Sequence, residues 1–434
     1  MRRDRVARRG GGRLRPPPLG PPSDIRALPP FVRLLAATQL AFNVGFFAVL
    51  PYLAAHLGGT LKMGGWLVGL VLGLRTFSQQ GLFVVGGALT DRWGPRPLVL
   101  AGCLLRIAGF VWLGYAQQTG SVIAAVLCVG FAAALFSPAV ESETARQAVR
   151  HEQATGHPRA RTLAVFSAAG QAGAFLGPLL GALLLLADFR TACLAGAAVF
   201  VAVLAGHWRW MPRERPEVVR REPDERGGAV RETARNGPFL LLCLAYGGYL
   251  LAYNQLYLAL PEEVVRATGS QAALGWLFAL SSLLVVCAQL PVTRAAGVRM
   301  GHRTALCAGL GVVAAGFLLV AAFAPVAPTG VVGLVPAAGY VLALTLGQML
   351  TVPAARALVT ELVPERRLGF SMGALSSLAG AVVLGGSAAT GALLGTGAAP
   401  AAVWSVLACV PLLGAAAGRA IRVRSGTDTT RPGV

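Results

Sequence analysis

The chain has 434 residues, of which 55% are hydrophobic and only 13% are charged, and its mean hydropathy is +0.64. Soluble proteins carry about 25% charged residues, so this composition excludes a soluble globular protein and predicts a membrane protein. The net charge of +20 is spread over the N-terminal segment, the loops between apolar runs and the C-terminal segment. A basic nucleic-acid-binding domain is therefore not expected.

Apolar runs long enough to cross a membrane recur along the chain. A hydrocarbon core of about 30 Å requires about 20 helical residues, and membrane-spanning backbone must satisfy its own hydrogen bonds. We predict an all-α membrane protein with twelve transmembrane helices in two pseudo-symmetric six-helix bundles. The predicted spans are 31–55, 66–89, 97–116, 121–143, 161–186, 191–210, 238–260, 272–293, 304–324, 331–353, 370–394 and 402–420.

Polar segments divide the chain into five predicted parts. A disordered basic cytoplasmic arm (1–30) precedes the N-terminal six-helix bundle (31–210). A cytoplasmic linker (211–237) leads to the C-terminal six-helix bundle (238–420), and a cytoplasmic tail (421–434) follows.

Basic residues predict the orientation in the membrane. If the N-terminus is placed inside, 33 of the 38 lysines and arginines fall on the inner side and three on the outer side, while Arg75 and Arg106 are embedded. Positive residues favour the cytoplasmic side. We therefore expect a multi-pass protein of the plasma membrane, embedded in the lipid bilayer, with both termini in the cytoplasm.

The loop after the second span has a counterpart in the second half of the chain. The segment GGALTDRWGPRPLVLAG (86–102) aligns with TRAAGVRMGHRTALCAG (293–309), 207 residues later, and Val298 replaces Asp91. Pro138 and Pro353 are a further matched pair. Asp91 can form a latch that opens and closes with conformation, or it can be incidental to a loop that only anchors topology. Two related halves indicate a transporter with its site at their interface.

Two motifs resemble a known family. The pattern Gly87-xxx-Asp91-Arg92-x-Gly94-x-Arg96 resembles the signature loop of the major facilitator superfamily. GAFLGPLLGA (173–182) resembles the motif of its drug:proton antiporter branch, and 72–97 with 104–110 is similar to one multidrug-exporter subfamily. This resemblance implies efflux of drugs or natural products in exchange for protons. It further implies the proton gradient as energy source and no cofactor.

The chain departs from the family pattern at two places. Pro95 stands where the loop is commonly basic, and span four lacks the arginine usual in many drug antiporters. If a charge relay survives, Arg92 or Arg96 must pair with Asp91 and with Glu141 or Glu143.

Three groups of residues are candidates for the mechanism. The conformational latch of the cytoplasmic loop comprises Gly87, Asp91, Arg92, Gly94, Arg96 and Glu141. The span-five motif comprises Gly173, Gly177, Pro178 and Gly181, either for helix packing alone or for a contact that moves during transport. In the superfamily fold the cavity-lining spans would place these polar or aromatic residues in the substrate cavity: Asn43, Arg75, Gln79, Gln171, Tyr249, Tyr253, Asn254 and Gln289.

Arg75 and a tyrosine stripe are the sharpest of these features. Arg75 lies sixteen residues before Asp91, about 24 Å along a helix, so it is deep in the bilayer. It is expected either to face a polar cavity or to bond to helix carbonyls for packing. Tyr246, Tyr249, Tyr253 and Tyr257 step by helical spacing along span seven, which suits either aromatic substrate binding or interhelical packing.

No carboxylate lies in the middle of a predicted span, and Glu141 is the nearest acid. A guanidinium about 6 Å from a bound cation would repel it by about 3 kcal/mol, so neutral, zwitterionic or anionic amphiphiles are the expected substrates. The only lysine is Lys62, which excludes a phosphate-binding loop for ATP. We expect no enzyme activity and no bound metal. The protein is expected to be a monomer whose partners are a small-molecule substrate and protons. The alternative is an importer or symporter of a small nutrient or siderophore.

Overall fold

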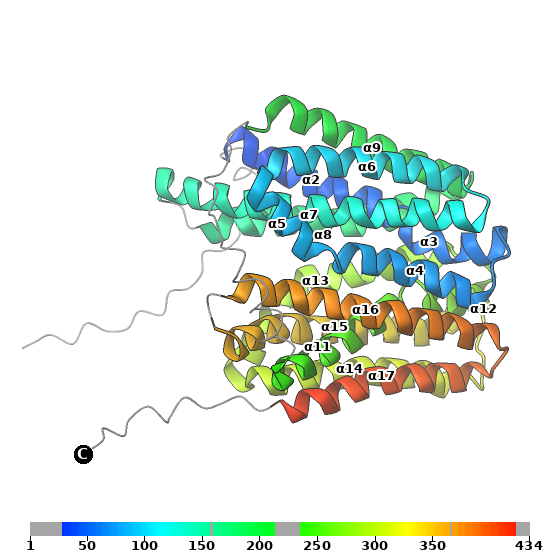
Figure 1. Cartoon of the computed structure of the whole chain (residues 1–434). Coiled ribbons are helices and arrows are strands. Elements are labelled where there is room, and N and C mark those ends of the chain that lie inside the picture. The colour runs from blue at the N-terminus through cyan, green and yellow to red at the C-terminus, as the bar shows by residue number, and fades with distance from the viewer. Residues whose placement is uncertain (1–27, 157–158, 213–234, 365–366, 422–434) are drawn as a thin grey trace, which may run out of the picture.

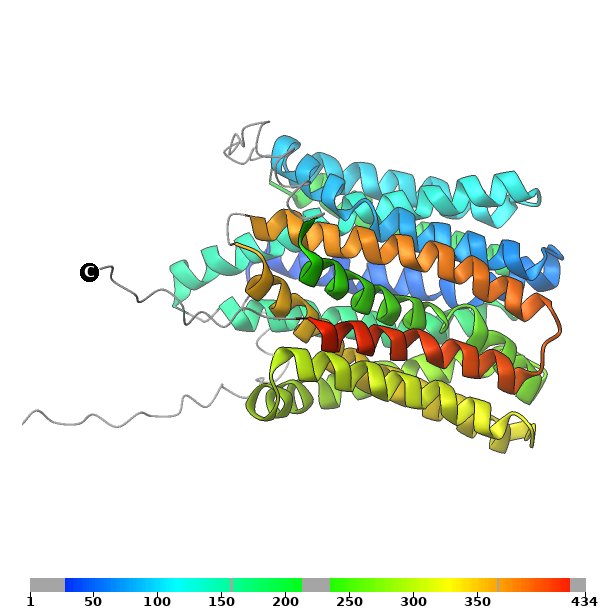
Figure 2. The same ribbon diagram turned by 60° about the horizontal axis from the view of Figure 1, so that its bottom comes forward.

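The computed structural model describes residues 28–156, 159–212, 235–364 and 367–421 (Figure 1). It contains twelve helices long and apolar enough to cross a membrane, which confirms the predicted spans. Most of the predicted arm, linker and tail lie outside the described residues. Within the described ranges every regular element is a helix, and the helices lie side by side with their axes roughly aligned (Figures 1 and 2).

The first six spans form one bundle, drawn from blue to green in Figure 1. Span one consists of three pieces and span two of two pieces. The elements are α2 (Pro30–Phe47), α3 (Leu50–Ala55), the π-helix η1 (His56–Thr60), α4 (Gly65–Gln80), α5 (Phe83–Trp93), α6 (Pro95–Tyr115), α7 (Thr119–Thr155), α8 (Arg159–Leu184) and α9 (Phe189–Trp210).

The last six spans form the second bundle, and span seven is broken in two. The elements are α11 (Gly237–Asn254), α12 (Ala259–Thr268), α13 (Ala272–Arg299), α14 (His302–Phe323), α15 (Gly330–Leu362), α16 (Leu368–Gly395) and α17 (Pro400–Ala420). Helix starts repeat between the bundles, since α2, α4 and α6 begin at Pro30, Gly65 and Pro95 and α11, α13 and α14 each begin 207 residues later.

Four spans are longer than their apolar segments predict. Span four ends at Thr155 instead of residue 143, and span ten ends at Leu362 instead of residue 353. Span seven reaches Thr268 and span eight reaches Arg299. The added turns are polar, so hydropathy does not reveal them, whereas the helix continues into water beyond the apolar core.

Exposed aromatic residues mark the two ends of the bundle. Trp93, Trp208 and Trp210 are 55–66% exposed at one end, and Trp66, Trp112 and Trp276 are 46–70% exposed at the other. Tryptophan favours membrane–water interfaces, so the two sets indicate where the bilayer surfaces lie. The first end also carries the α5–α6 and α13–α14 turns with their arginines, and we call it the arginine-rich end.

The core joins the two bundles at one end only. One buried cluster includes residues of the first bundle together with Leu256, Leu260 and Phe278 of the second, near the end opposite the arginine-rich end. A separate cluster around Phe239, Leu306 and Leu358 belongs to the second bundle alone. The bundles therefore share a core at the opposite end and have separate cores toward the arginine-rich end.

Candidate functional site

A glycine contact joins the two bundles along α4 and α16. Gly65, Gly69 and Gly73 recur every fourth residue on α4, and a Cβ at any of them would come within 3.0 Å of backbone atoms of α16. A Cβ at Gly391 of α16 would likewise come within 3.0 Å of backbone atoms of Gly65. Small residues allow such backbone approach, which favours helix association within a membrane. This glycine stripe was not predicted, although its spacing in GWLVGLVLG is visible in the sequence.

A chain of hydrogen bonds crosses the same interface near the middle of spans two and seven. The Thr76 hydroxyl donates to Asn254 Oδ1 at 3.1 Å, and Asn254 Nδ2 donates to Ser387 Oγ at 2.8 Å. All three side chains are buried. Asn254 was predicted to line the cavity; instead it bridges α4, α11 and α16, at the last residue before span seven breaks.

Arg75 is buried within the first bundle. Nη2 donates to Gln79 Oε1 at 2.8 Å, Nη1 donates to Thr76 Oγ1 at 3.4 Å, and the guanidinium lies 4.5 Å from the centroid of the Phe46 ring. Only 6% of the residue is exposed, so its side chain is packed inside the protein. Arg75 was expected to face a polar cavity or to bond to helix carbonyls. It instead bonds to two side chains and lies against an aromatic ring.

Arg106 is even more deeply buried, at 1% exposure. Its guanidinium lies among four phenylalanine rings at 4.8–5.5 Å and donates one hydrogen bond, from Nη1 to the Val129 carbonyl at 2.9 Å. A guanidinium at the centre of a span costs at least about 2.5–3.5 kcal/mol, and each cation–π contact offsets about 0.5–2 kcal/mol. This aromatic cage was not predicted, since its rings come from three different spans.

The tyrosine stripe on α11 is continuous in space. Neighbouring ring centroids lie 5.8, 6.2 and 6.0 Å apart from Tyr246 through Tyr249 and Tyr253 to Tyr257. Tyr249 and Tyr257 are buried, whereas Tyr246 and Tyr253 are half-buried. Tyr246 and Tyr253 are therefore the more accessible residues of the stripe, whereas Tyr249 and Tyr257 pack inside the protein.

The bundles separate around Glu141 and Arg356. Within the described residues α7 makes no substantial contact with α13 or α15, and no residue of α13 from Leu283 onward is buried. Glu141 of α7 and Arg356 of α15 are both exposed, and they attract each other electrostatically. Both accessible side chains therefore lie where α7 of the first bundle stands apart from α13 and α15 of the second.

Glu141 and Arg356 also occupy matched positions in the repeat. Each follows a matched proline, Pro138 or Pro353, by three residues. Arg356 further acts electrostatically on Tyr246 and Tyr249. An acid, a base and two tyrosines therefore influence one another electrostatically. Extending the proline alignment by three residues would have revealed the charged pair.

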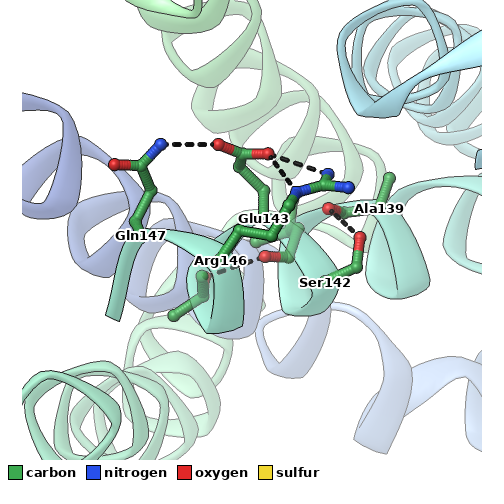
Figure 3. Close-up of polar contacts among 7 residues, drawn as sticks. Ala139, Ser142, Glu143, Arg146 and Gln147 are labelled. Atoms are coloured by element: carbon green, nitrogen blue, oxygen red, sulfur yellow. Dashed lines mark hydrogen bonds and ion pairs between the residues drawn. The ribbon is translucent and has the colours of Figure 1, made fainter. Parts of the chain in front are cut away.

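The end of α7 holds a separate ion pair (Figure 3). Arg146 donates to Glu143 Oε2 at 2.8 and 3.0 Å, and Gln147 donates to Glu143 Oε1 at 2.8 Å. Arg96 donates to the Trp208 carbonyl at 2.9 Å. Among the described residues, the partners of Glu143 lie on its own helix, and no bond joins it to Arg92 or Arg96.

The loop from α5 to α6 reverses at Gly94, whose φ of 82° favours glycine. Gly86 packs against the backbone of α7, whereas a Cβ at Gly87 would meet nothing within 4 Å. The tight helix contact thus belongs to Gly86 instead of the motif residue Gly87. Arg92 is exposed, and the side chain of Asp91 lies outside the described residues.

The span-five motif packs α8 against span one. A Cβ at Gly173, Gly177 or Gly181 would come within 3.0 Å of atoms of α2 or of its continuation. The Pro178 carbonyl accepts a hydrogen bond from the Tyr52 hydroxyl at 2.7 Å. Asn43 Nδ2 donates to the Gly170 carbonyl at 2.8 Å, so the half-buried Asn43 also takes part in this contact.

Two remaining candidates are half-buried. Gln289 of α13 donates to Thr293 Oγ1 at 3.1 Å, within the part of α13 that has no buried residue. Gln171 is also half-buried, at the middle of α8.

Comparison with known proteins identifies the family. The model of the Major Facilitator Superfamily matches residues 32–261 and 242–433. An uncharacterized MFS-type transporter of Mycobacterium tuberculosis is 38% identical over 371 residues, covering 83% of this chain and 85% of the relative. Multidrug resistance protein MdtH of Aeromonas hydrophila is 32% identical over 339 residues, covering 78% and 81%.

A solved structure shares the fold. A peptide transporter POT in complex with sulfate superposes with a TM-score of 0.73 at 15% identity, covering 89% of this chain and 93% of that chain. These relatives and structural neighbours are transporters, so this multi-pass membrane protein is a transporter and not an enzyme. The chain belongs to the major facilitator superfamily.

Proposed function

We propose that the chain is a secondary active transporter of the plasma membrane that exports small amphiphilic compounds in exchange for protons by alternating access. The observation that carries the proposal is the uneven contact between the bundles. They share a core at one end and stay in contact along α4, α5 and α16, while α7 of the first bundle stands apart from α13 and α15 of the second at the arginine-rich end. Rocking about the contact would expose the space between them to each side in turn.

Export is supported by the orientation and by the relatives. Arginine enrichment supports a cytoplasmic location for the arginine-rich end, so this conformation would admit a compound from the cell interior or the inner leaflet. The MdtH proteins, 31–32% identical, bear the name multidrug resistance protein. The span-five motif points to the drug:proton antiporter branch by resemblance.

The cavity wall indicates a class of substrate. Tyr246 and Tyr253 offer accessible aromatic rings, which suit flat apolar groups. Glu141 and Arg356 compensate each other, so the wall as a whole favours neutral or zwitterionic amphiphiles over permanent cations. Glu141 is also the acid best placed to take up and release a proton.

Everted membrane vesicles test this proposal. Cytoplasmic compounds lie outside such vesicles, so an exporter should accumulate a fluorescent zwitterionic amphiphile in them when the lumen is acidic, and a protonophore should abolish uptake. Vesicles without the protein serve as the control. Accumulation only in right-side-out vesicles would instead establish the importer, and uptake unaffected by the protonophore would contradict proton exchange.

A further inference from the structure

The side-chain amide of Gln79 is held in one orientation by Arg75. Arg75 Nη2 donates to Gln79 Oε1 at 2.8 Å. A guanidinium has donors and no acceptor, so the amide oxygen must face Arg75 and the NH2 group must point away from it. Arg75 is itself fixed, because it is only 6% exposed and its guanidinium lies 4.5 Å from the centroid of the Phe46 ring. Gln79 therefore presents a donor of fixed direction.

The NH2 group of Gln79 has no partner within the described part of the chain. Nε2 forms no hydrogen bond there, although Oε1 accepts one from Arg75. Gln79 is half-buried, and its Nε2 is not one of the fully buried atoms that lack a partner, whereas Arg75 Nε is. An accessible amide donor of fixed direction offers a hydrogen bond to a molecule from outside the chain.

The contacts of its neighbours place Gln79 between the two bundles. Arg75 lies against Phe46 of the first bundle, and Thr76 bonds to Asn254 of the second. Residues three and four apart share a helix face, so Gln79 lies one turn further along the face that Arg75 and Thr76 define. That turn is nearer to the arginine-rich end, because α4 leads through α5 to the α5–α6 turn. Gln79 therefore faces the space in which the bundles separate.

An aromatic residue of the second bundle borders the same space. Tyr253 precedes Asn254 on α11 and is half-buried. It lies close enough to Arg75 for an electrostatic interaction. The two bundles thus contribute different chemistry, since Tyr253 offers a surface for flat apolar groups and Gln79 offers a hydrogen-bond donor.

We propose that Gln79 is a specificity-determining residue that selects flat compounds carrying a hydrogen-bond acceptor, such as a ketone or amide carbonyl. Gln79 Nε2 donates to this acceptor, and Arg75 is a positioning residue that keeps the amide oxygen turned away from the compound. This role rests on the proposed function, because it requires small amphiphiles to enter the space between the bundles. Among such amphiphiles it favours acceptor-bearing compounds over donor-bearing compounds of the same shape.

Binding to the purified protein in detergent tests this role without a transport assay. Three compounds share one zwitterionic side chain and carry a fluorene, fluorenone or carbazole ring system. They place a methylene, a carbonyl acceptor or an N–H donor at the same position. Isothermal titration calorimetry should give a Kd about 3- to 10-fold lower for the fluorenone compound than for the fluorene compound, as expected for one hydrogen bond. The carbazole compound should show no such gain.

Two substitutions of Gln79 separate its donor from its size. Gln79→Glu should reverse the preference in favour of the carbazole compound, because a carboxylate that accepts from Arg75 has only acceptors left. Gln79→Leu should bind the fluorenone and fluorene compounds equally. Gln80→Glu is the matched control, since Gln80 is also half-buried but lies against α16, where a Cβ at Gly380 would be 3.4 Å from its Cβ. This control should keep the wild-type preference.

Equal Kd values of the wild type for the fluorene and fluorenone compounds would overturn the role of Gln79 and leave the proposed function standing. A gain for both the fluorenone and the carbazole compounds would overturn the fixed orientation, because an amide that turns freely serves acceptors and donors alike. A fluorenone preference that persists in Gln79→Leu would assign the donor to another residue. If none of the three compounds binds, the amphiphile class of the proposed function is wrong, and the role of Gln79 is wrong with it.

Discussion

Replacing Gly391 by alanine is expected to reduce transport at least tenfold. The new Cβ would lie well under 3.0 Å from the Gly65 carbonyl oxygen and would also crowd the Gly69 nitrogen. Both are backbone atoms, so no side-chain rotation relieves the contact, and α4 and α16 must move apart. Overpacking of this kind costs about 1–3 kcal/mol. It acts on the contact about which the bundles are proposed to rock.

Gly385→Ala is the matched control, because it makes the same substitution on the same helix. Gly385 is exposed, and a Cβ there would meet nothing within 4 Å. Efflux and membrane abundance should therefore match the wild type in this variant. Equal efflux by Gly391→Ala and Gly385→Ala would show that close approach of α4 and α16 is not needed for transport.

Neutralising either member of the Glu141–Arg356 pair is expected to shift charge preference in opposite directions. Arg356→Gln leaves Glu141 without its opposing charge, so transport of a permanent lipophilic cation should rise relative to that of an anion. Glu141→Gln should do the reverse. At about 10 Å and an effective dielectric near 20, one unit charge is worth about 1.7 kcal/mol, and solvent screening lowers this to roughly a tenfold change.

The double variant Glu141→Gln with Arg356→Gln provides the control, since it removes both charges and should restore the wild-type preference. The measurement is the ratio of efflux of a cation to that of an anion of similar size. If both single variants shift this ratio in the same direction, their charges do not act on the bound compound.

The sequence was sufficient to predict the twelve spans and the repeat, because hydropathy and glycine-rich turns are local signals. Gly94 could be assigned to a sharp turn for the same reason. The partners of single polar residues were harder to predict. Asn254 reads as a cavity residue, yet its neighbours Thr76 and Ser387 lie 178 and 133 residues away. Only packing of the two bundles decides between a bridge and a cavity wall.

For Arg75 and Arg106, too, the sequence predicted the position along the helix but not the neighbouring side chains. Their depth was predictable from helix length, whereas the aromatic rings that surround Arg106 come from spans one, three and six. The accessible pair Glu141 and Arg356 could have been found from the repeat, since both follow matched prolines. The sequence does not show that these opposite charges attract each other, because Glu141 and Arg356 lie in different bundles.

Thiol accessibility tests the proposed alternating access most directly. A cysteine at Gln289 lies ten residues, about 15 Å, from the end of α13 at Arg299. In a variant without the native cysteines, Gln289→Cys should react with a membrane-impermeant reagent added from the cytoplasmic side and not from outside, while Thr60→Cys reports the outer surface. Reaction of Gln289→Cys from the outside alone in resting membranes would contradict a cavity that opens at the arginine-rich end.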